Sequence, residues 1–100
     1  MLKDFFLGFV KVHILYHASK APIYGVEIHE ELARHGYQLS AGTLYPTLHR
    51  LEKDGYLVRQ PRVVAGKVRN YYTITQKGRT ALSEARKKIR ELVTEVIKEK

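Results

Sequence analysis

The chain has 100 residues and no cysteine, and its 18 lysines and arginines against 10 acidic residues give a formal net charge of +8 at pH 7. This length allows a single domain, the absence of cysteine excludes disulfides and thiol catalysis, and no apolar run reaches the roughly 18 residues of a membrane span. The charge favours a polyanionic partner, and we expect the protein to be cytoplasmic.

The first predicted helix, residues 3 to 18, carries apolar side chains on nearly every face. A helix with this pattern must be buried on two sides. One side belongs to the core of the domain, and we expect the other to meet a second subunit through Phe5, Phe6 and Phe9. The alternative interpretation is a helix buried wholly within its own domain.

A second helix is predicted over residues 24 to 34, with Val26 or Ile28 and with Leu32 turned inward. Its exposed face is acidic, which makes it a poor DNA reader and favours a supporting role, as in the first helix of a helix-turn-helix. The turn that follows brings Leu39 toward the core.

A leucine stripe predicts the third helix, over residues 41 to 54: Leu44, Leu48 and Leu51. Ser40 precedes this stripe and is predicted to cap the helix with its side chain. The opposite face carries small, hydroxyl-bearing and basic residues, which suits a helix that lies in the major groove of DNA. Pro46 leaves two alternatives open, an irregular first turn or a tolerated kink.

Two strands are predicted next, residues 56 to 62 and 68 to 74, with the residues between them as a wing. Leu57 and Val58 are expected to pack under the helices, and Pro61 fits an edge strand. Six basic residues and two acidic ones lie between positions 50 and 69, so this fifth of the chain carries half of the net charge.

The last helix is predicted from Thr75, its N-cap, to residue 100. Its apolar residues alternate spacings of three and four, as in a heptad seam: Leu82, Ala85, Ile89, Leu92 and Val96. A rod of about 37 Å is longer than a small domain can cover by itself, so we expect a homodimer. Folding back along the same domain, the alternative, accounts only for the first part of the seam. The expected division is a DNA-binding unit over residues 1–75 and a dimerisation helix over 76–100.

Four segments together resemble the PadR-type, phenolic-acid-responsive transcriptional regulators: YGVEIHEEL (24–32), SAGTLYPTLHRLEKDGYL (40–57), YYTIT (71–75) and QKGRTAL (76–82). The resemblance covers residues 5 to about 82 and is to a short form without a large C-terminal domain. It implies a mainly α (α+β) fold, a winged helix-turn-helix with a two-stranded wing and a long C-terminal dimerisation helix. It also implies repression of promoters until a small molecule intervenes.

Specific residues are predicted to contact double-stranded DNA. Base-edge contacts are expected from the start of the third helix, namely Ala41, Gly42, Thr43 and Tyr45. Phosphate contacts are expected from Tyr24, His49, Arg50, Lys53, Lys67 and Arg69. The expected dimer interface consists of Phe5, Phe6, Phe9, Ile89, Leu92, Val93, Val96 and Ile97. Two roles are open for six of these residues: Phe5, Phe6, Phe9, Val93, Val96 and Ile97. Either they line an effector pocket for a hydrophobic or phenolic compound, or they form a dry interface.

Other functions find less support in the sequence. There is no glycine-rich phosphate loop and no nucleophile with a partnered base, so no enzyme is predicted. His13 and His17 have the i, i+4 spacing of zinc ligands, but two histidines are too few, and no metal or other cofactor is expected. Two rival functions stay open: non-specific architectural DNA binding, and a winged-helix module that binds an acidic protein.

Overall fold

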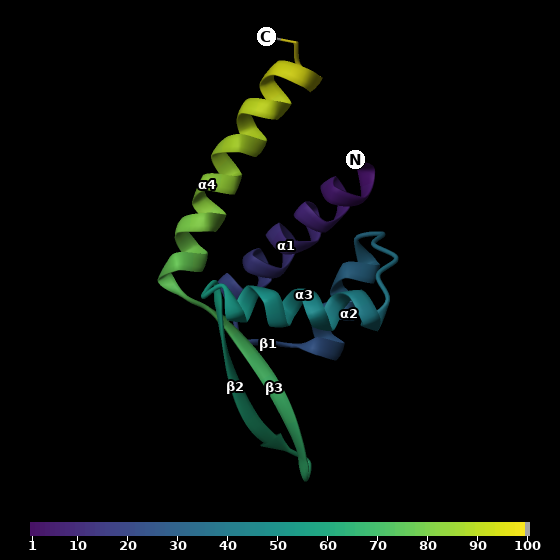
Figure 1. The fold of residues 1–100 in the computed structure, drawn as a ribbon, viewed down its shortest axis with the longest axis vertical. Coiled ribbons are helices and arrows are strands. Elements are labelled where there is room, and N and C mark those ends of the chain that lie inside the picture. The colour runs from purple at the N-terminus through teal and green to yellow at the C-terminus, as the bar shows by residue number, and fades with distance from the viewer. Residues whose placement is uncertain (100) are drawn as a thin grey trace.

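The computed structural model describes residues 1–99. Its elements in chain order are α1 (Leu2–Lys20), β1 (Ile23–Tyr24), α2 (Gly25–Arg34), α3 (Ala41–Lys53), β2 (Leu57–Val64), β3 (Lys67–Ile74), α4 (Gln76–Leu92) and the single π-helical turn η1 (Val93–Ile97). Figure 1 shows α1, α2 and α3 gathered together, with the β2–β3 hairpin extending from one side and α4 running away on the other. This is the predicted winged helix-turn-helix with a long C-terminal helix. Within the described residues, no helix is both long enough and apolar enough to cross a membrane.

The core lies between α1, α2 and α3, and one apolar stripe from each helix fills it. Its most buried side chains are at most 1% exposed: Val10, Ile14, Ile28, Leu32, Leu44 and Leu48. The predicted leucine stripe of α3 is confirmed, since Leu51 is buried as well, and Leu39 closes the same core from the turn before α3. Of the two residues considered for α2, Ile28 points inward while Val26 is 55% exposed.

The sheet has three antiparallel strands in the order β1-β3-β2. β2 pairs with β3 along its whole length, from Leu57 opposite Ile74 to Val64 opposite Lys67. Pro61 therefore lies on an edge strand, as predicted. The sequence pattern does not predict β1, because a strand of two residues is defined by its partner in β3 rather than by an alternation of its own.

Three local predictions are wrong. Tyr24 is extended and belongs to β1, so the second helix begins at Gly25. Val58 is 44% exposed, because successive strand side chains point to opposite faces and Leu57 takes the inward position. The strands also extend further into the wing than predicted. Its turn consists of Ala65 and Gly66 alone, both with positive φ, as a two-residue hairpin turn requires.

The C-terminal helix begins as predicted and ends differently. The Thr75 hydroxyl oxygen accepts a hydrogen bond from the Gly78 N–H at 3.0 Å, which confirms the N-cap. From Val93 on, the prediction of a regular α-helix is wrong, because the Lys98 N–H donates to the Val93 carbonyl five residues back. This wider turn changes the direction in which the last apolar side chains point. Residue 100 lies outside the described residues.

Candidate nucleic-acid interface

Ser40 precedes α3, but its side chain does not cap the helix. Its carbonyl accepts hydrogen bonds from the N–H groups of Thr43 and Leu44, at 3.0 and 2.9 Å. Its hydroxyl donates instead to Oγ1 of Thr43 at 3.3 Å. The predicted side-chain cap is therefore wrong, because the hydroxyl bonds a second hydroxyl rather than an N–H of the first turn.

Pro46 lies inside α3, and the helix continues through it to Lys53.

The outward face of α3 carries most of the residues predicted to contact DNA. Six of them are exposed: Ala41, Gly42, Tyr45, His49, Arg50 and Lys53. Thr43 is half-buried. The side chain of His49 is 76% exposed, with Nδ1 3.8 Å from Oε1 of Glu52. The start of α3 is thus a low surface of small residues, and its basic residues follow about two to three turns later.

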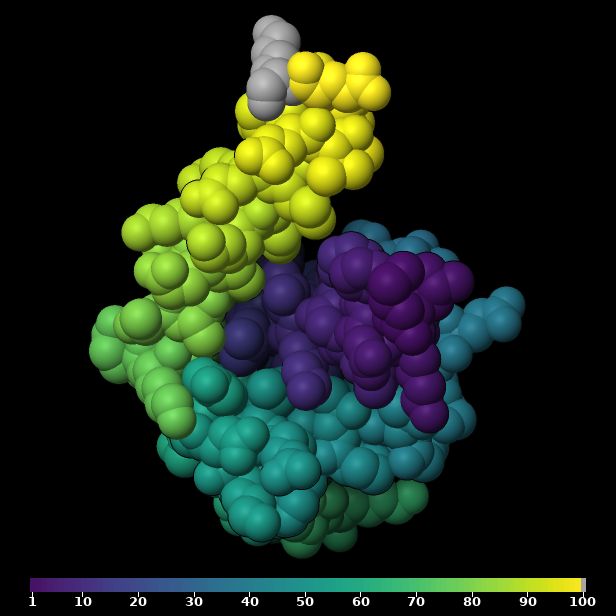
Figure 2. Space-filling view, turned by 45° about the horizontal axis from the view of Figure 1, so that its top comes forward, coloured from purple at the N-terminus to yellow at the C-terminus, as the bar shows by residue number. Residues whose placement is uncertain are grey.

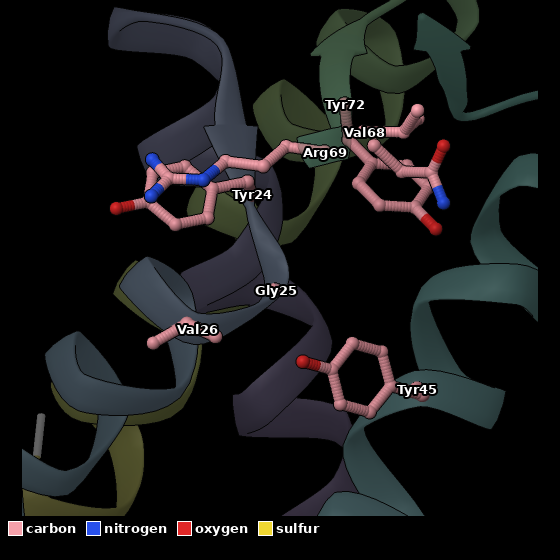
Figure 3. A pocket seen from close by; sticks show the side chains of 8 residues that line it. Tyr24, Gly25, Val26, Tyr45, Val68, Arg69 and Tyr72 are labelled. Atoms are coloured by element: carbon pink, nitrogen blue, oxygen red, sulfur yellow. The ribbon is translucent and has the colours of Figure 1, made fainter. Parts of the chain in front are cut away.

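A cavity of about 240 Å³ lies where the start of α2 meets α3 and the sheet. In Figure 3, Tyr45 projects from α3 toward Gly25. A Cβ at Gly25 would lie 2.3 Å from Cε1 of Tyr45, so a larger residue would push the ring away. Gly25 therefore leaves the space occupied by Tyr45, a side chain that is predicted to contact base edges.

Two tyrosines lie side by side on the sheet next to this cavity, and an arginine covers each of them. The Arg69 guanidinium lies over the Tyr24 ring at 4.7 Å, the Tyr24 and Tyr71 ring centroids are 5.3 Å apart, and the Arg62 guanidinium lies over Tyr71 at 4.6 Å. We call these four residues the arginine–tyrosine stack. Tyr24 and Arg69 were predicted as DNA contacts, but Arg62 and Tyr71 were missed, because strand register rather than sequence spacing brings them together.

Further basic residues border the α3 face from two sides. Lys67 is exposed beside the turn of the wing. Lys3 and Lys11 of α1 line a shallow cavity of about 360 Å³ together with Gly42 and Arg50 of α3. The α1 lysines were missed as candidate contacts, since only the packing of α1 against the other helices places them next to α3.

Winged-helix DNA-binding proteins have a basic face around the exposed second helix of the helix-turn-helix, here α3, and a two-stranded wing. The chain matches the Transcriptional regulator PadR-like family over residues 14–84. It is a member of the PadR family. Membership identifies this PadR protein as a DNA-binding transcriptional regulator, which is not an enzyme.

Similar proteins agree with this assignment. The PadR protein is 49% identical to "Transcriptional regulator Rv3488" of Mycobacterium tuberculosis, over 96% of this chain and 90% of that protein. A PadR-family regulator from Eggerthella lenta superposes with a TM-score of 0.84 at 32% identity, covering 98% of this chain and 87% of that one. A PadR-like regulator from Bacillus cereus gives 0.83 at 32% identity, covering 91% and 90%.

The PadR protein also exposes apolar side chains along α1, α4 and η1. We call these residues the α1–α4 face, and they are between 37% and 72% exposed: Phe5, Phe9, Ile89, Leu92, Val93, Val96 and Ile97. Phe6 differs from the other predicted interface residues, because it packs on Tyr37 of its own chain at 5.3 Å between ring centroids. Figure 2 shows the end of α4 projecting beside α1, away from the rest of the molecule.

A groove of about 390 Å³ lies within the α1–α4 face. Six apolar side chains line it: Met1, Phe5, Phe9, Val12, Ala85 and Ile89. Asp4 and Lys88 are the charged residues beside it. Apolar walls with a few polar groups are typical of sites for small hydrophobic molecules, and equally of an interface before its partner binds.

Proposed function

We propose that this PadR protein is a homodimeric repressor that binds a specific operator in double-stranded DNA. The observation that carries the proposal is the exposed face of α3, with the basic residues of α1 and of the wing on either side. Residues 1–75 form the DNA-binding unit, and residues 76–100 form the dimerisation segment. The protein acts in the cytoplasm. Two copies of α3 then reach two half-sites, as in other helix-turn-helix dimers.

The proposed contacts divide according to their chemistry. Base edges are read by Ala41, Gly42, Thr43 and Tyr45, where small side chains permit close approach. Phosphates are bound by Tyr24, His49, Arg50, Lys53, Lys67 and Arg69, and the structure adds Lys3, Lys11 and Arg62 as candidates. The base-reading group has no Asn, Gln or Arg, so much of the specificity comes from DNA shape and half-site spacing.

A fluorescence-anisotropy titration tests the proposal, with a duplex from the protein's own promoter region and a scrambled duplex at several salt concentrations. We expect a preference of roughly a thousandfold for one natural sequence. If the promoter gives no preference, selection from a random pool searches for an operator elsewhere. Affinity without any preference would favour architectural binding, and absence of binding would favour a protein partner.

Lys67→Ala is expected to weaken binding to every duplex by a similar factor, because Lys67 contacts a phosphate rather than a base. The slope of log affinity against log salt concentration should fall by about one ion. The control is Lys87→Ala on α4, outside the proposed DNA face, which should leave the slope unchanged. An unchanged slope for Lys67→Ala would remove this residue from the phosphate contacts.

The effector part of the proposal places a small hydrophobic or phenolic molecule in the groove between α1 and α4. Apolar walls formed by Phe5, Phe9 and Ile89 support it, together with Lys88, whose ammonium group suits a carboxylate. Release of the operator when phenolic acids are added to the same titration would support this role. If operator affinity does not change when any of these compounds is added, the groove has no effector role and belongs to the proposed dimer interface only.

A further inference from the structure

Three histidines come together on the side of the molecule where α1 packs against the end of α2. His13 and His17 lie one turn apart on α1, and His35 directly follows α2. One ring nitrogen of each can be chosen such that all three lie within 4.8 Å of one another. The sequence shows only the pair on α1, because His35 joins it through tertiary packing.

The surroundings of these histidines suit them to act as metal ligands. Nε2 of His17 is buried and has no hydrogen-bond partner among the described residues, although buried ring nitrogens are usually paired. Burial is the main cause that lowers the pKa of both His13 and His17. The charge of His35 lowers both values further, while the Glu31 carboxylate opposes the shift at His17. A lowered pKa favours the neutral imidazole, which is the form that coordinates a metal ion.

We propose that His13, His17 and His35 bind one divalent transition-metal ion, of which Zn²⁺ is the representative. In a tetrahedral site with bonds of about 2.0 to 2.1 Å, ligand nitrogens lie about 3.3 Å apart. The ring nitrogens must therefore approach one another by somewhat more than an ångström at most, which requires small side-chain rotations of the three histidines. Imidazole is a preferred ligand for Zn²⁺, and the fourth position remains for water.

Neighbouring side chains can orient the three ligands. Oε1 of Glu31 lies 3.9 Å from Nε2 of His35, so this carboxylate is placed to act as an outer-shell partner or to complete the coordination. Tyr37 packs edge-on against the His13 ring at 5.1 Å. A metal ion here would join α1 to the end of α2, immediately before the turn that leads to α3.

Isothermal titration calorimetry with Zn²⁺ tests the site, on tag-free protein that has been treated with a chelator. We expect one Zn²⁺ per chain with a micromolar or tighter Kd. His35→Ala should weaken binding by about 100-fold, since even outer-shell partners are worth 10- to 100-fold, and Glu31→Gln should weaken it by about 10-fold. His49→Ala is the matched control, because it removes an exposed histidine outside the cluster and should leave the Kd unchanged.

Two results would overturn the proposal: wild-type protein that binds no Zn²⁺ below millimolar concentration, or the same Kd for His35→Ala and His49→Ala. His35 is exposed, so its variant is expected to fold, which circular dichroism verifies. A His13→Ala variant then gives a second, independent loss of affinity. The titration contains no DNA, so its outcome is separate from that of the operator experiment.

Discussion

Leu92→Glu is expected to prevent the proposed dimerisation of the PadR protein and to lower its affinity for the proposed operator by at least about 100-fold. Leu92 belongs to the α1–α4 face and is 53% exposed within one chain. An interface that buries an unpaired carboxylate loses stability. A monomer contacts only one half-site, and loss of a linked second contact lowers affinity by factors of about 10² to 10⁴.

Sedimentation velocity measures the dimer, and the anisotropy titration measures the affinity. The matched control is Thr94→Glu, which adds the same charge two residues later, on the opposite side of the helix. This variant should remain dimeric and bind the operator normally. A Leu92→Glu protein that stays dimeric would show that the interface lies elsewhere on the molecule.

Gly78→Ala is expected to destabilise the protein by about 3 kcal/mol, at the upper end of the range for overpacked sites. A Cβ at Gly78 would lie 2.3 Å from the Tyr56 carbonyl oxygen and 2.6 Å from Cγ1 of Ile74. The first of these neighbours is backbone, which cannot rotate away. The first turn of α4 would therefore have to move away from the strands that support it.

Thermal unfolding at a fixed protein concentration measures this effect, and Tm should fall by about 12 °C or more. Gly42→Ala is the control, because Gly42 also lies in the first turn of a helix and its added Cβ meets only Oγ of Ser40, at 3.8 Å. Its stability should remain equal or increase slightly. Equal Tm values for the two variants would contradict the proposed clash.

The elements with a regular pattern of their own could be predicted from the sequence. The leucine stripe of α3 places three side chains at helical spacing, and all three are buried. Thr75 has the residue type and position of an N-cap, and it makes the expected hydrogen bond. Both signals act within a few residues, so neighbouring amino acids are sufficient to determine them.

Features that depend on tertiary contacts could not be predicted in this way. β1 exists only through its pairing with β3, and the arginine–tyrosine stack depends on the register of three strands. Phe6 has the same residue type as its neighbours Phe5 and Phe9, yet Tyr37 provides it with a partner inside its own chain. His35 is distant in sequence from the histidines of α1, so nothing local relates it to them.

The arginine–tyrosine stack has a consequence for the entropy of DNA binding. A free arginine samples many rotamers, and immobilising such a side chain in a complex costs about 0.5–1.5 kcal/mol. The guanidinium groups of Arg62 and Arg69 already lie over tyrosine rings before any DNA is present. Their ordering is therefore part of folding rather than of association. In the proposed DNA complex, the charges of the wing are already positioned before they meet the DNA backbone.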